Sequence, residues 1–492
     1  MDSELCGVRS FTRARLLALA GVGAAALAFP GALSGLARAA EGEPVRRFVS
    51  RPDLVPPAID VSTTLPTAAP GYVFLAPFTG PSQLGPLVVD DSGEPVWFQP
   101  VPETSNMAVH DFRVQTYRGR PVLTWWEGTF EAGYGRGECV VVDDSYREIA
   151  RFGAGNGLSA DLHEFTITSR DTALVTAYVG VPSDLSAAGG PVDGTLLEGV
   201  VQEIHIASGA VLFEWHSSEH VGLEESNLPS TAGLWDYFHL NSVDLLDDDD
   251  LLVSARHTCA VYKLDRDTGE IVWRLGGKRS DFAMGPGTSF AFQHDARAHG
   301  PSVVSIFDDG AYSPQSAIEP VSRAIVIELD LDAMTARLAS AYANPAGALT
   351  YAMGNAQELS DGGTFVGWGT TPQFTEFAPD GSVRFDATFA GGGSYRAYRA
   401  QWTGEPSAPP SLAVVRNGDG SAQAYVSWNG ATRVSHWQLL GGPGHTALKS
   451  LHTVVRTGFE TSIRVKEAHP FLAAVALDGR SRALAATRVV RV

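Results

Sequence analysis

Five segments of this sequence each open with a polar side chain at the start of an apolar strand. They read HDFRVQTY, HEFTITSR, HLNSVDLL, HDARAHGP and NAQELSDG, and they begin at His110, His163, His239, His294 and Asn355. Imidazoles serve as nucleophiles, as general acids and bases, and as ligands for oxyanions. A lone histidine at a strand start is usually a hydrogen-bonded structural residue, but five equivalent positions favour a shared ligand site.

Each segment continues into a tight turn and a second apolar strand, so the turn centre fixes which residues face each other. With Asp247–Asp250 as one turn, Asn241 and Arg256 fall beside His239, whereas His257 is expected to face the other way. The same arithmetic places Glu127 near His110, Tyr178 near His163, Asp308 near His294 and Trp368 near Asn355. This mixture of basic, acidic and aromatic groups suits an aromatic substrate that carries an anion.

Asp308 has two interpretations, as a carboxylate that orients His294 or as a turn residue, and Asp295 is expected to point to the opposite strand face. The run Asp247–Asp250 lacks the spacing of a calcium loop and is interpreted as a charged hairpin turn. No Gly-rich phosphate loop is recognisable, so we expect no nucleotide and no other cofactor. No metal-ligand spacing is recognisable either, so we also expect no metal.

A second phrase recurs six times and reveals the elements that position these residues. An apolar pair, a turn and a strand appear in VVDDSGEPVWF, VVDDSYREIARF, IHIASGAVLFEW, YKLDRDTGEIVW, IELDLDAMTARL and FTEFAPDGSVRF. The copies lie roughly 50 to 65 residues apart, which suits one four-stranded antiparallel sheet per copy. The sequence therefore predicts an all-β protein with a six-bladed β-propeller over residues 65–404, in which the polar strand starts face a central channel.

The two ends of the chain differ from this repeat. Residues 1–39 combine Arg9, Arg13 and Arg15 with an Ala/Gly-rich apolar stretch and the small-x-small signal Ala37–Ala39. We interpret them as an export signal peptide, which makes the mature protein secreted or attached to the cell surface without an integral membrane domain. The alternative is a retained membrane anchor. Residues 40–64 are expected to form an N-terminal extension.

After Gly404 the composition changes. Residues 405–411 are expected to form a linker, and residues 412–492 alternate like the strands of a small β-sandwich similar to a fibronectin type III domain. Its expected role is spacing or contact with a partner. The two cysteines beyond the signal, Cys139 and Cys259, either pair or remain buried thiols. The net charge, 36 − 55 = −19, argues against nucleic acid as a partner and leaves the oligomeric state open.

Two segments resemble the nucleotide-independent aryl sulfotransferases of bacteria and their relatives in actinobacteria and fungi. FHLNSVDLLDDDDLLVSARHTCAVYKLD is similar to the family segment with a catalytic His and Arg, and FQHDARAHGPSVVSIFDDG to the segment with its nucleophilic His. The resemblance covers about residues 65 to 405. It implies a six-bladed propeller that transfers a sulfuryl group from an aryl sulfate donor to a phenolic acceptor through a sulfated histidine.

Carried over by position, the resemblance implies His294 as nucleophile, His239 as acid and base, and Arg256 and His163 as ligands of the sulfuryl oxygens. We expect His110, Asn241, Asn355, Tyr178, Trp368 and Asp308 to contribute to substrate binding. The sequence lacks a recognisable N-terminal β-domain of the family and adds the C-terminal module. Two alternatives stay open, a non-catalytic exported propeller that binds a ligand or partner and a sulfatase-like hydrolase that uses water as acceptor.

Overall fold

The structure is a computed structural model that describes residues 44–102, 107–131, 133–231, 233–466 and 469–492. The interpreted export signal lies outside these residues. The described chain is built from β-strands in seven sheets, which confirms the all-β class. Its described helical segments are single turns, η2 (Ser186–Ala188), α2 (Ser217–His220) and η3 (Leu223–Glu225). None of the described helices is long and apolar enough to cross a membrane.

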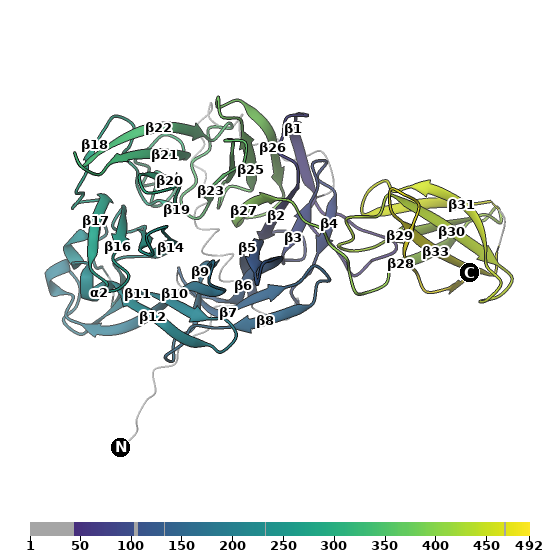
Figure 1. The fold of residues 1–492 in the computed structure, drawn as a ribbon, viewed down its shortest axis with the longest axis horizontal. Coiled ribbons are helices and arrows are strands. Elements are labelled where there is room, and N and C mark those ends of the chain that lie inside the picture. Colours follow the sequence, from purple (N-terminus) through teal and green to yellow (C-terminus); the bar gives the residue numbers. More distant parts are fainter. Residues whose placement is uncertain (1–43, 103–106, 132, 232, 467–468) are drawn as a thin grey trace, which may run out of the picture.

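Five of the sheets surround a common centre (Figure 1) and contain six units of four antiparallel strands. The first unit is β2 (Tyr72–Pro77), β3 (Leu87–Val89), β4 (Pro95–Phe98) and β27 (Ser394–Ala400). The second is β5 (Met107–Tyr117), β6 (Arg120–Phe130), β7 (Gly135–Val142) and β8 (Glu148–Phe152). The third is β9 (Ala160–Ile167), β10 (Thr172–Ser183), β11 (Gly194–His205) and β12 (Ala210–His216). A pair between Gly137 of β7 and Ala160 of β9 joins the second and third units.

The remaining units follow the same order along the chain. The fourth is β14 (Leu240–Leu245), β15 (Leu251–Ala255), β16 (Ala260–Leu264) and β17 (Ile271–Gly276). The fifth is β19 (His294–Ala298), β20 (Val303–Asp308), β21 (Arg323–Asp330) and β22 (Thr335–Ala343). The sixth is β23 (Asn355–Glu358), β24 (Thr364–Gly367), β25 (Gln373–Phe377) and β26 (Val383–Phe389). Each recurring phrase of the sequence supplies the two outer strands of one unit.

Strands from both ends of this region interlock. β27, the last strand of the region, pairs with β2, and β1 (Ile59–Thr64) pairs with β26 as an additional outer strand. β1 lies in the range interpreted as an N-terminal extension. Two short strands pair in parallel at sheet edges, β13 (Leu234–Asp236) with β11 and β18 (Ala283–Met284) with β22.

The inner strands bring the polar strand starts together. β27, β5, β9, β14, β19 and β23 contact one another in this order, and β23 contacts β27 again. Between each pair of successive units lies a cluster of buried apolar side chains, because each sheet buries both of its faces. The inner strand ends are thereby held rigidly around the centre.

The C-terminal residues form two further sheets. One contains β28 (Ser411–Arg416), β29 (Ala422–Ser427) and β32 (Glu460–Val465). The other contains β30 (His436–Gly442), β31 (Lys449–Val455), β33 (Phe471–Leu477), β34 (Ala483–Ala486) and β35 (Val490–Arg491). The sheets share a core that includes Trp437 and Ile463. Asn429 exchanges hydrogen bonds of 2.9 and 3.0 Å with the backbone of Phe98, which docks this part on the first unit.

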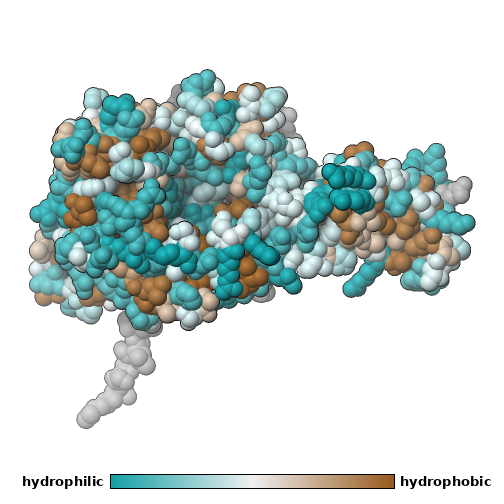
Figure 2. Space-filling view, viewed as in Figure 1, coloured by the Kyte–Doolittle hydropathy of each residue, from teal (hydrophilic) through white to brown (hydrophobic). Residues whose placement is uncertain are grey.

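The two cysteines of the described chain, Cys139 and Cys259, are free and buried. Cys139 lies on β7, and Cys259 lies in the turn after β15. Much of the molecular surface seen in Figure 2 is hydrophilic, with apolar residues in scattered groups. This surface agrees with the strongly negative net charge of the chain.

Candidate active site

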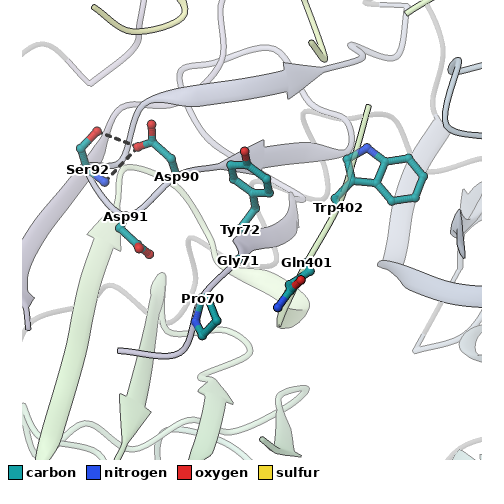
Figure 3. A pocket seen from close by; sticks show the side chains of 8 residues that line it. All are labelled: Pro70, Gly71, Tyr72, Asp90, Asp91, Ser92, Gln401 and Trp402. Atoms are coloured by element: carbon teal, nitrogen blue, oxygen red, sulfur yellow. Dashed lines mark hydrogen bonds between the residues drawn. The ribbon is translucent and has the colours of Figure 1, made fainter. Parts of the chain in front are cut away.

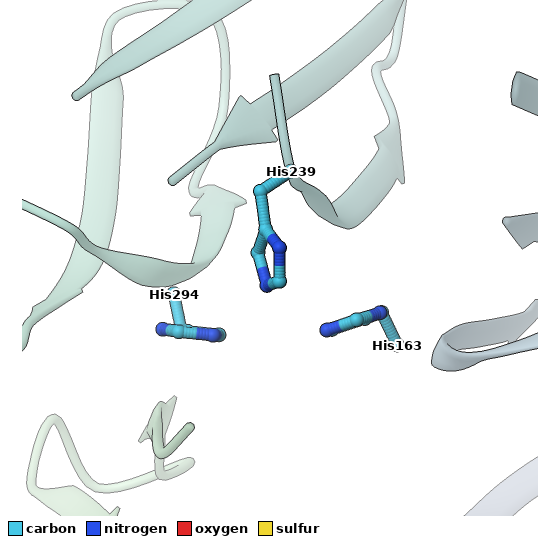
Figure 4. Close-up of side chains that lie close together, drawn as sticks. All are labelled: His163, His239 and His294. Atoms are coloured by element: carbon cyan, nitrogen blue, oxygen red, sulfur yellow. The ribbon is translucent and has the colours of Figure 1, made fainter. Parts of the chain in front are cut away.

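Three imidazoles on or next to inner strands point toward one another (Figure 4). His163 comes from β9, His239 from the residue before β14 and His294 from the first position of β19. One ring nitrogen of each lies within 4.8 Å of the other two, and the ring centroids of His239 lie 4.9 Å from His163 and 6.4 Å from His294. All three are buried. We call these residues the histidine cluster.

Each histidine of the cluster is held by its own aspartate through Nδ1. The pairs are His163 with Asp161 at 2.6 Å, His239 with Asp236 at 2.5 Å, and His294 with Asp309 at 2.7 Å. Asp161 and Asp236 also accept the backbone N–H of their partner histidines. These contacts fix the ring orientations and leave the three Nε2 atoms for the interior.

The aspartate that orients His294 is therefore Asp309 and not Asp308. Asp308 accepts the backbone N–H of Ala291 at 3.0 Å and pairs with Arg323. The hairpin pairing misled here for two reasons: a register shift places Phe307 opposite His294, and Asp309 lies beyond the end of β20, where strand alternation no longer applies. Sequence alternation alone could not have revealed it.

The contacts of His294 also define its tautomer. The backbone N–H of Met353 lies 3.3 Å from Nε2 of His294. Because an N–H can only donate, Nε2 is the unprotonated nitrogen of the neutral ring, and Nδ1 donates its proton to Asp309. The lone pair of Nε2 is thus available for attack when a substrate displaces the hydrogen bond from the Met353 N–H.

Arg256 is anchored beside the cluster. Its Nη2 donates to the carbonyls of Tyr312 and Tyr351 at 3.0 and 2.7 Å, and its Nη1 donates to Nε2 of His257 at 3.0 Å. Its buried Nε has no hydrogen-bond partner among the described residues. The guanidinium is therefore held in place with donor capacity to spare.

His257 faces the site, contrary to the expectation from strand alternation. Its Nδ1 donates to the carbonyl of Asp236 at 2.6 Å, and its ring lies 4.6 Å from that of His239. Alternation fails because β15 ends at Ala255 and the chain turns through residues 256–259, with a positive φ of 52° at Cys259. Residues in a turn do not alternate between two faces.

The electrostatics of the site disfavour a charged ring at His239 and at His294. Burial lowers the pKa of His294 and of His239 well below the usual value for histidine, and the Arg256 charge adds to the effect on both. Burial also raises the pKa of Asp309 well above the usual value for a carboxyl group. A neutral His294 is the form that a nucleophile requires.

Three other predicted residues lie around the cluster. The Tyr178 ring is 5.9 Å from His163 and 6.3 Å from His239, and its hydroxyl donates to the Leu240 carbonyl. Asn241 donates from Nδ2 to the Gln293 carbonyl, and its Oδ1 has no partner within the described part of the chain. His110 lies in an aromatic environment, and burial lowers its pKa to about 3.

Two predicted substrate-binding residues lie elsewhere. The side-chain amide of Asn355 accepts a hydrogen bond from the backbone N–H of Ala397 and donates one to its carbonyl, which links β23 to β27. Trp368 is fully buried between Phe307 and Phe377 in the core of the fifth and sixth units. Glu127, which was expected near His110, pairs with Val109 and accepts from Trp125, because Trp126 is the residue opposite His110.

Tyr395 is a central residue that the repeat pattern missed. Its ring centroid lies 5.7 Å from His163, 5.6 Å from His110 and 6.5 Å from His294. Its hydroxyl donates to the His163 carbonyl at 3.0 Å. Tyr395 belongs to β27, whose partner β2 lies more than three hundred residues earlier, so no local hairpin marked it.

A second set of charged residues lies beside the cluster, and each of its acids directly follows a histidine in the sequence. We call it the ion-pair network, and it comprises Asp111, Glu164 and Asp295 with Arg113, Arg297 and Arg396. Asp295 therefore does not point away from the centre. It has a positive φ of 51°, and the strand bulges after His294, so both consecutive side chains reach the interior.

A separate pocket lies at the other end of β27 from Tyr395 (Figure 3). It is lined by Pro70, Gly71, Tyr72, Asp90, Asp91, Ser92, Gln401 and Trp402. Asp90 accepts hydrogen bonds from the N–H and hydroxyl of Ser92, and Asp91 pairs with Arg399 at 2.7 Å. Both carboxylates are thus already engaged, and the pocket brings no histidine together.

A comparison with known protein families assigns the chain to one of them. The family of Arylsulfotransferases (ASST) matches residues 113–390, more than half of the chain, and the protein therefore belongs to this family. This confirms the resemblance seen in the sequence and indicates a sulfotransferase-type enzyme. The matched range includes every member of the histidine cluster and Arg256. No curated protein matches the chain.

Several solved structures are similar at low identity. A Bacteroides caccae protein of unknown function is 12% identical, with 67% of this chain and 98% of that chain covered and a TM-score of 0.40. A periplasmic gluconolactonase of Pseudomonas aeruginosa is 14% identical, with 81% of this chain and 99% of that chain covered and a TM-score of 0.34. A virginiamycin B lyase variant of Staphylococcus aureus is 8% identical, with 76% of this chain and 97% of that chain covered and a TM-score of 0.34. Because the TM-scores are below 0.5, we draw no conclusion about this chain from these similarities.

Proposed function

We propose that this protein transfers a sulfuryl group from an aryl sulfate ester to a phenolic acceptor through a sulfohistidine at His294. The observation that carries the proposal is the orientation of His294, whose Nε2 lone pair faces two other imidazoles while Asp309 holds Nδ1. Membership of the arylsulfotransferase family supports the same chemistry.

In the first half-reaction, Nε2 of His294 attacks sulfur as the bond from sulfur to the aryl oxygen breaks. The leaving phenolate takes a proton from His239, and a phenol acceptor later returns a proton to it. A sulfuryl group in transfer spreads negative charge over three oxygens, as a phosphoryl group does. Arg256 supplies donors for these oxygens, and His163 supplies another when the charge of the bound sulfate brings a second proton to its Nε2.

The low pKa of His239 is compatible with this role. Without substrate, burial and the neighbouring basic groups, Arg256 among them, disfavour a proton on His239. An aryl sulfate brings a negative charge into the cluster, which favours the protonated imidazole. Asp236, hydrogen-bonded to Nδ1 of His239, stabilises that imidazolium. His239 thus becomes an acid when the donor is bound.

Intact-mass measurement after exposure to nitrophenyl sulfate tests the proposal. Wild-type protein should gain the mass of one sulfuryl group and lose it when a phenol is added, with the sulfated phenol as product. His294→Asn should show neither the mass gain nor release of nitrophenol. Loss of the sulfuryl group to water at an equal rate without phenol would indicate a hydrolase instead. Absence of both reactions across several donors would indicate a binding protein.

We further propose that the six units form a six-bladed β-propeller closed by the pairs of β27 with β2 and of β1 with β26. The C-terminal two-sheet sandwich would be of fibronectin type III kind. Residues 1–39 would direct export, so the enzyme would act outside the cytoplasm on phenols that reach it there. N-terminal sequencing of the protein recovered from the culture medium tests the last point.

A further inference from the structure

The histidine cluster also has the composition of a metal site. We propose that His163, His239 and His294 bind one divalent cation of the zinc type through their Nε2 atoms, and that this cation and the sulfuryl group exclude each other. The metal site rests on the geometry of the described side chains alone, whereas its exclusion of the sulfuryl group rests on the proposed function.

The first support is the set of ligand atoms. Zinc in catalytic sites is commonly held by three protein ligands, with imidazole nitrogens frequent, and keeps one position open. The three nitrogens here lie within 4.8 Å of one another. With bonds of about 2.1 Å, a tetrahedral ion holds its ligand nitrogens about 3.4 Å apart, so small ring rotations would close the site.

The second support is the outer shell of the cluster. Histidines that bind metals almost always donate Nδ1–H to a carboxylate or carbonyl, which fixes the ring and raises its basicity. All three histidines here have this arrangement, with Nδ1 to carboxylate distances of 2.5 to 2.7 Å. Three independent carboxylate pairs exceed what one nucleophilic histidine needs.

The third support is charge. The cluster and its contacts contain three acidic side chains, Asp161, Asp236 and Asp309, against one basic side chain that is not a histidine, Arg256. A cation bound by the three nitrogens would lie among these acidic side chains. The alternative group Asp236, His239 and His257 is less suitable, because Nε2 of His257 accepts a hydrogen bond from the cationic Arg256 side chain at 3.0 Å.

The test uses the full exported chain, stripped with a chelator and titrated with Zn²⁺ by calorimetry and with Co²⁺ by visible absorption. We expect one site per chain and a tetrahedral cobalt spectrum. Replacing His163, His239 or His294 by Ala should weaken Zn²⁺ binding by at least about 100-fold. Asp309→Asn, which retains all three ligands, should weaken it by about 10- to 100-fold.

His205→Ala is the matched control, because His205 is exposed on the outer strand β11 and should leave binding unchanged. Circular dichroism and thermal midpoints should show that each variant folds. Absence of binding by a folded wild-type chain would overturn the inference, and so would binding that the three cluster variants retain or that His205→Ala abolishes.

A parallel activity assay separates this inference from the proposed function. If both hold, one equivalent of Zn²⁺ should inhibit sulfuryl transfer, and a chelator should restore it. Transfer by a protein that binds no Zn²⁺ would refute the metal site alone. Binding through the three histidines by a protein that transfers nothing would refute the proposed transferase alone.

Discussion

The histidine cluster and the ion-pair network lie side by side at the centre of the fold, yet burial has opposite outcomes for Glu164 in the network and for Asp309 beside the cluster. In the network, burial alone would raise the pKa of Glu164, but Arg113, Arg297 and Arg396 hold it well below the usual value. In the cluster, burial raises the pKa of Asp309 well above the usual value. Ion pairs with arginines stabilise the Glu164 carboxylate, whereas Asp309 is paired with an imidazole and stays responsive to the charge of a ligand.

Adjacent residues of the sequence contribute to the two regions. His163 precedes Glu164, and His294 precedes Asp295. Register shifts after His294 and after His110 let consecutive side chains both reach the centre. One inner strand therefore contributes a reactive group and a structural group from neighbouring positions, and mutations one residue apart should have different consequences.

The largest effect is expected for His294→Asn. It should reduce kcat for transfer from nitrophenyl sulfate by roughly 10⁴-fold or more, because no covalent intermediate can form. The thermal midpoint should stay close to that of wild type, because His294 is not part of the ion-pair network. Steady-state kinetics and a melting curve on the same preparation check both. Substantial residual transfer would exclude His294 as nucleophile.

The next effect concerns stability. Glu164→Gln should lower the free energy of unfolding by about 3 to 5 kcal/mol, because it leaves one buried and two partly buried arginines short of one carboxylate. Asp309→Asn is the matched substitution in the cluster, and it should cost much less because it removes a carboxylate that burial destabilises. Denaturant unfolding of the two variants measures the difference. Equal losses would mean that the two regions do not differ as described.

A smaller effect is expected at His257, which positions Arg256. His257→Leu removes the acceptor of Nη1 and should lower kcat/KM by about 10- to 100-fold. His257→Gln offers an acceptor oxygen and should recover part of the loss. A merely structural role would lower the melting midpoint of both variants alike without separating their kinetics.

The smallest effect is the acid dependence of His110. Burial lowers its pKa to about 3, so below pH 6.5 the unfolded chain takes up a proton that the folded chain does not. Stability contributed by the neutral ring is therefore lost as pH falls from 6.5 toward 3. His110→Phe should reduce the slope of unfolding free energy against pH by up to about 1.4 kcal/mol per unit. Identical slopes would show that His110 does not titrate in this way.

Local sequence patterns determined much of this protein. Hairpins are formed by residues close in the chain, so the turn and strand phrases revealed the six repeated units and the polar strand starts. The same locality brought Arg256 to His239, where the structure has a backbone hydrogen bond of 2.9 Å between them. The family also followed from these local motifs.

Only the tertiary structure decided which side chains complete the site. Asp309 replaced Asp308, and His257 and Asp295 face the centre, because bulges and turns break the two-residue alternation on which sequence reasoning depends. Tyr395 came from a strand whose partner is remote in sequence. Asn355 and Trp368 lie in the expected hairpin but have structural roles. The amide of Asn355 pairs with the backbone of the neighbouring strand β27, and Trp368 packs in the apolar core.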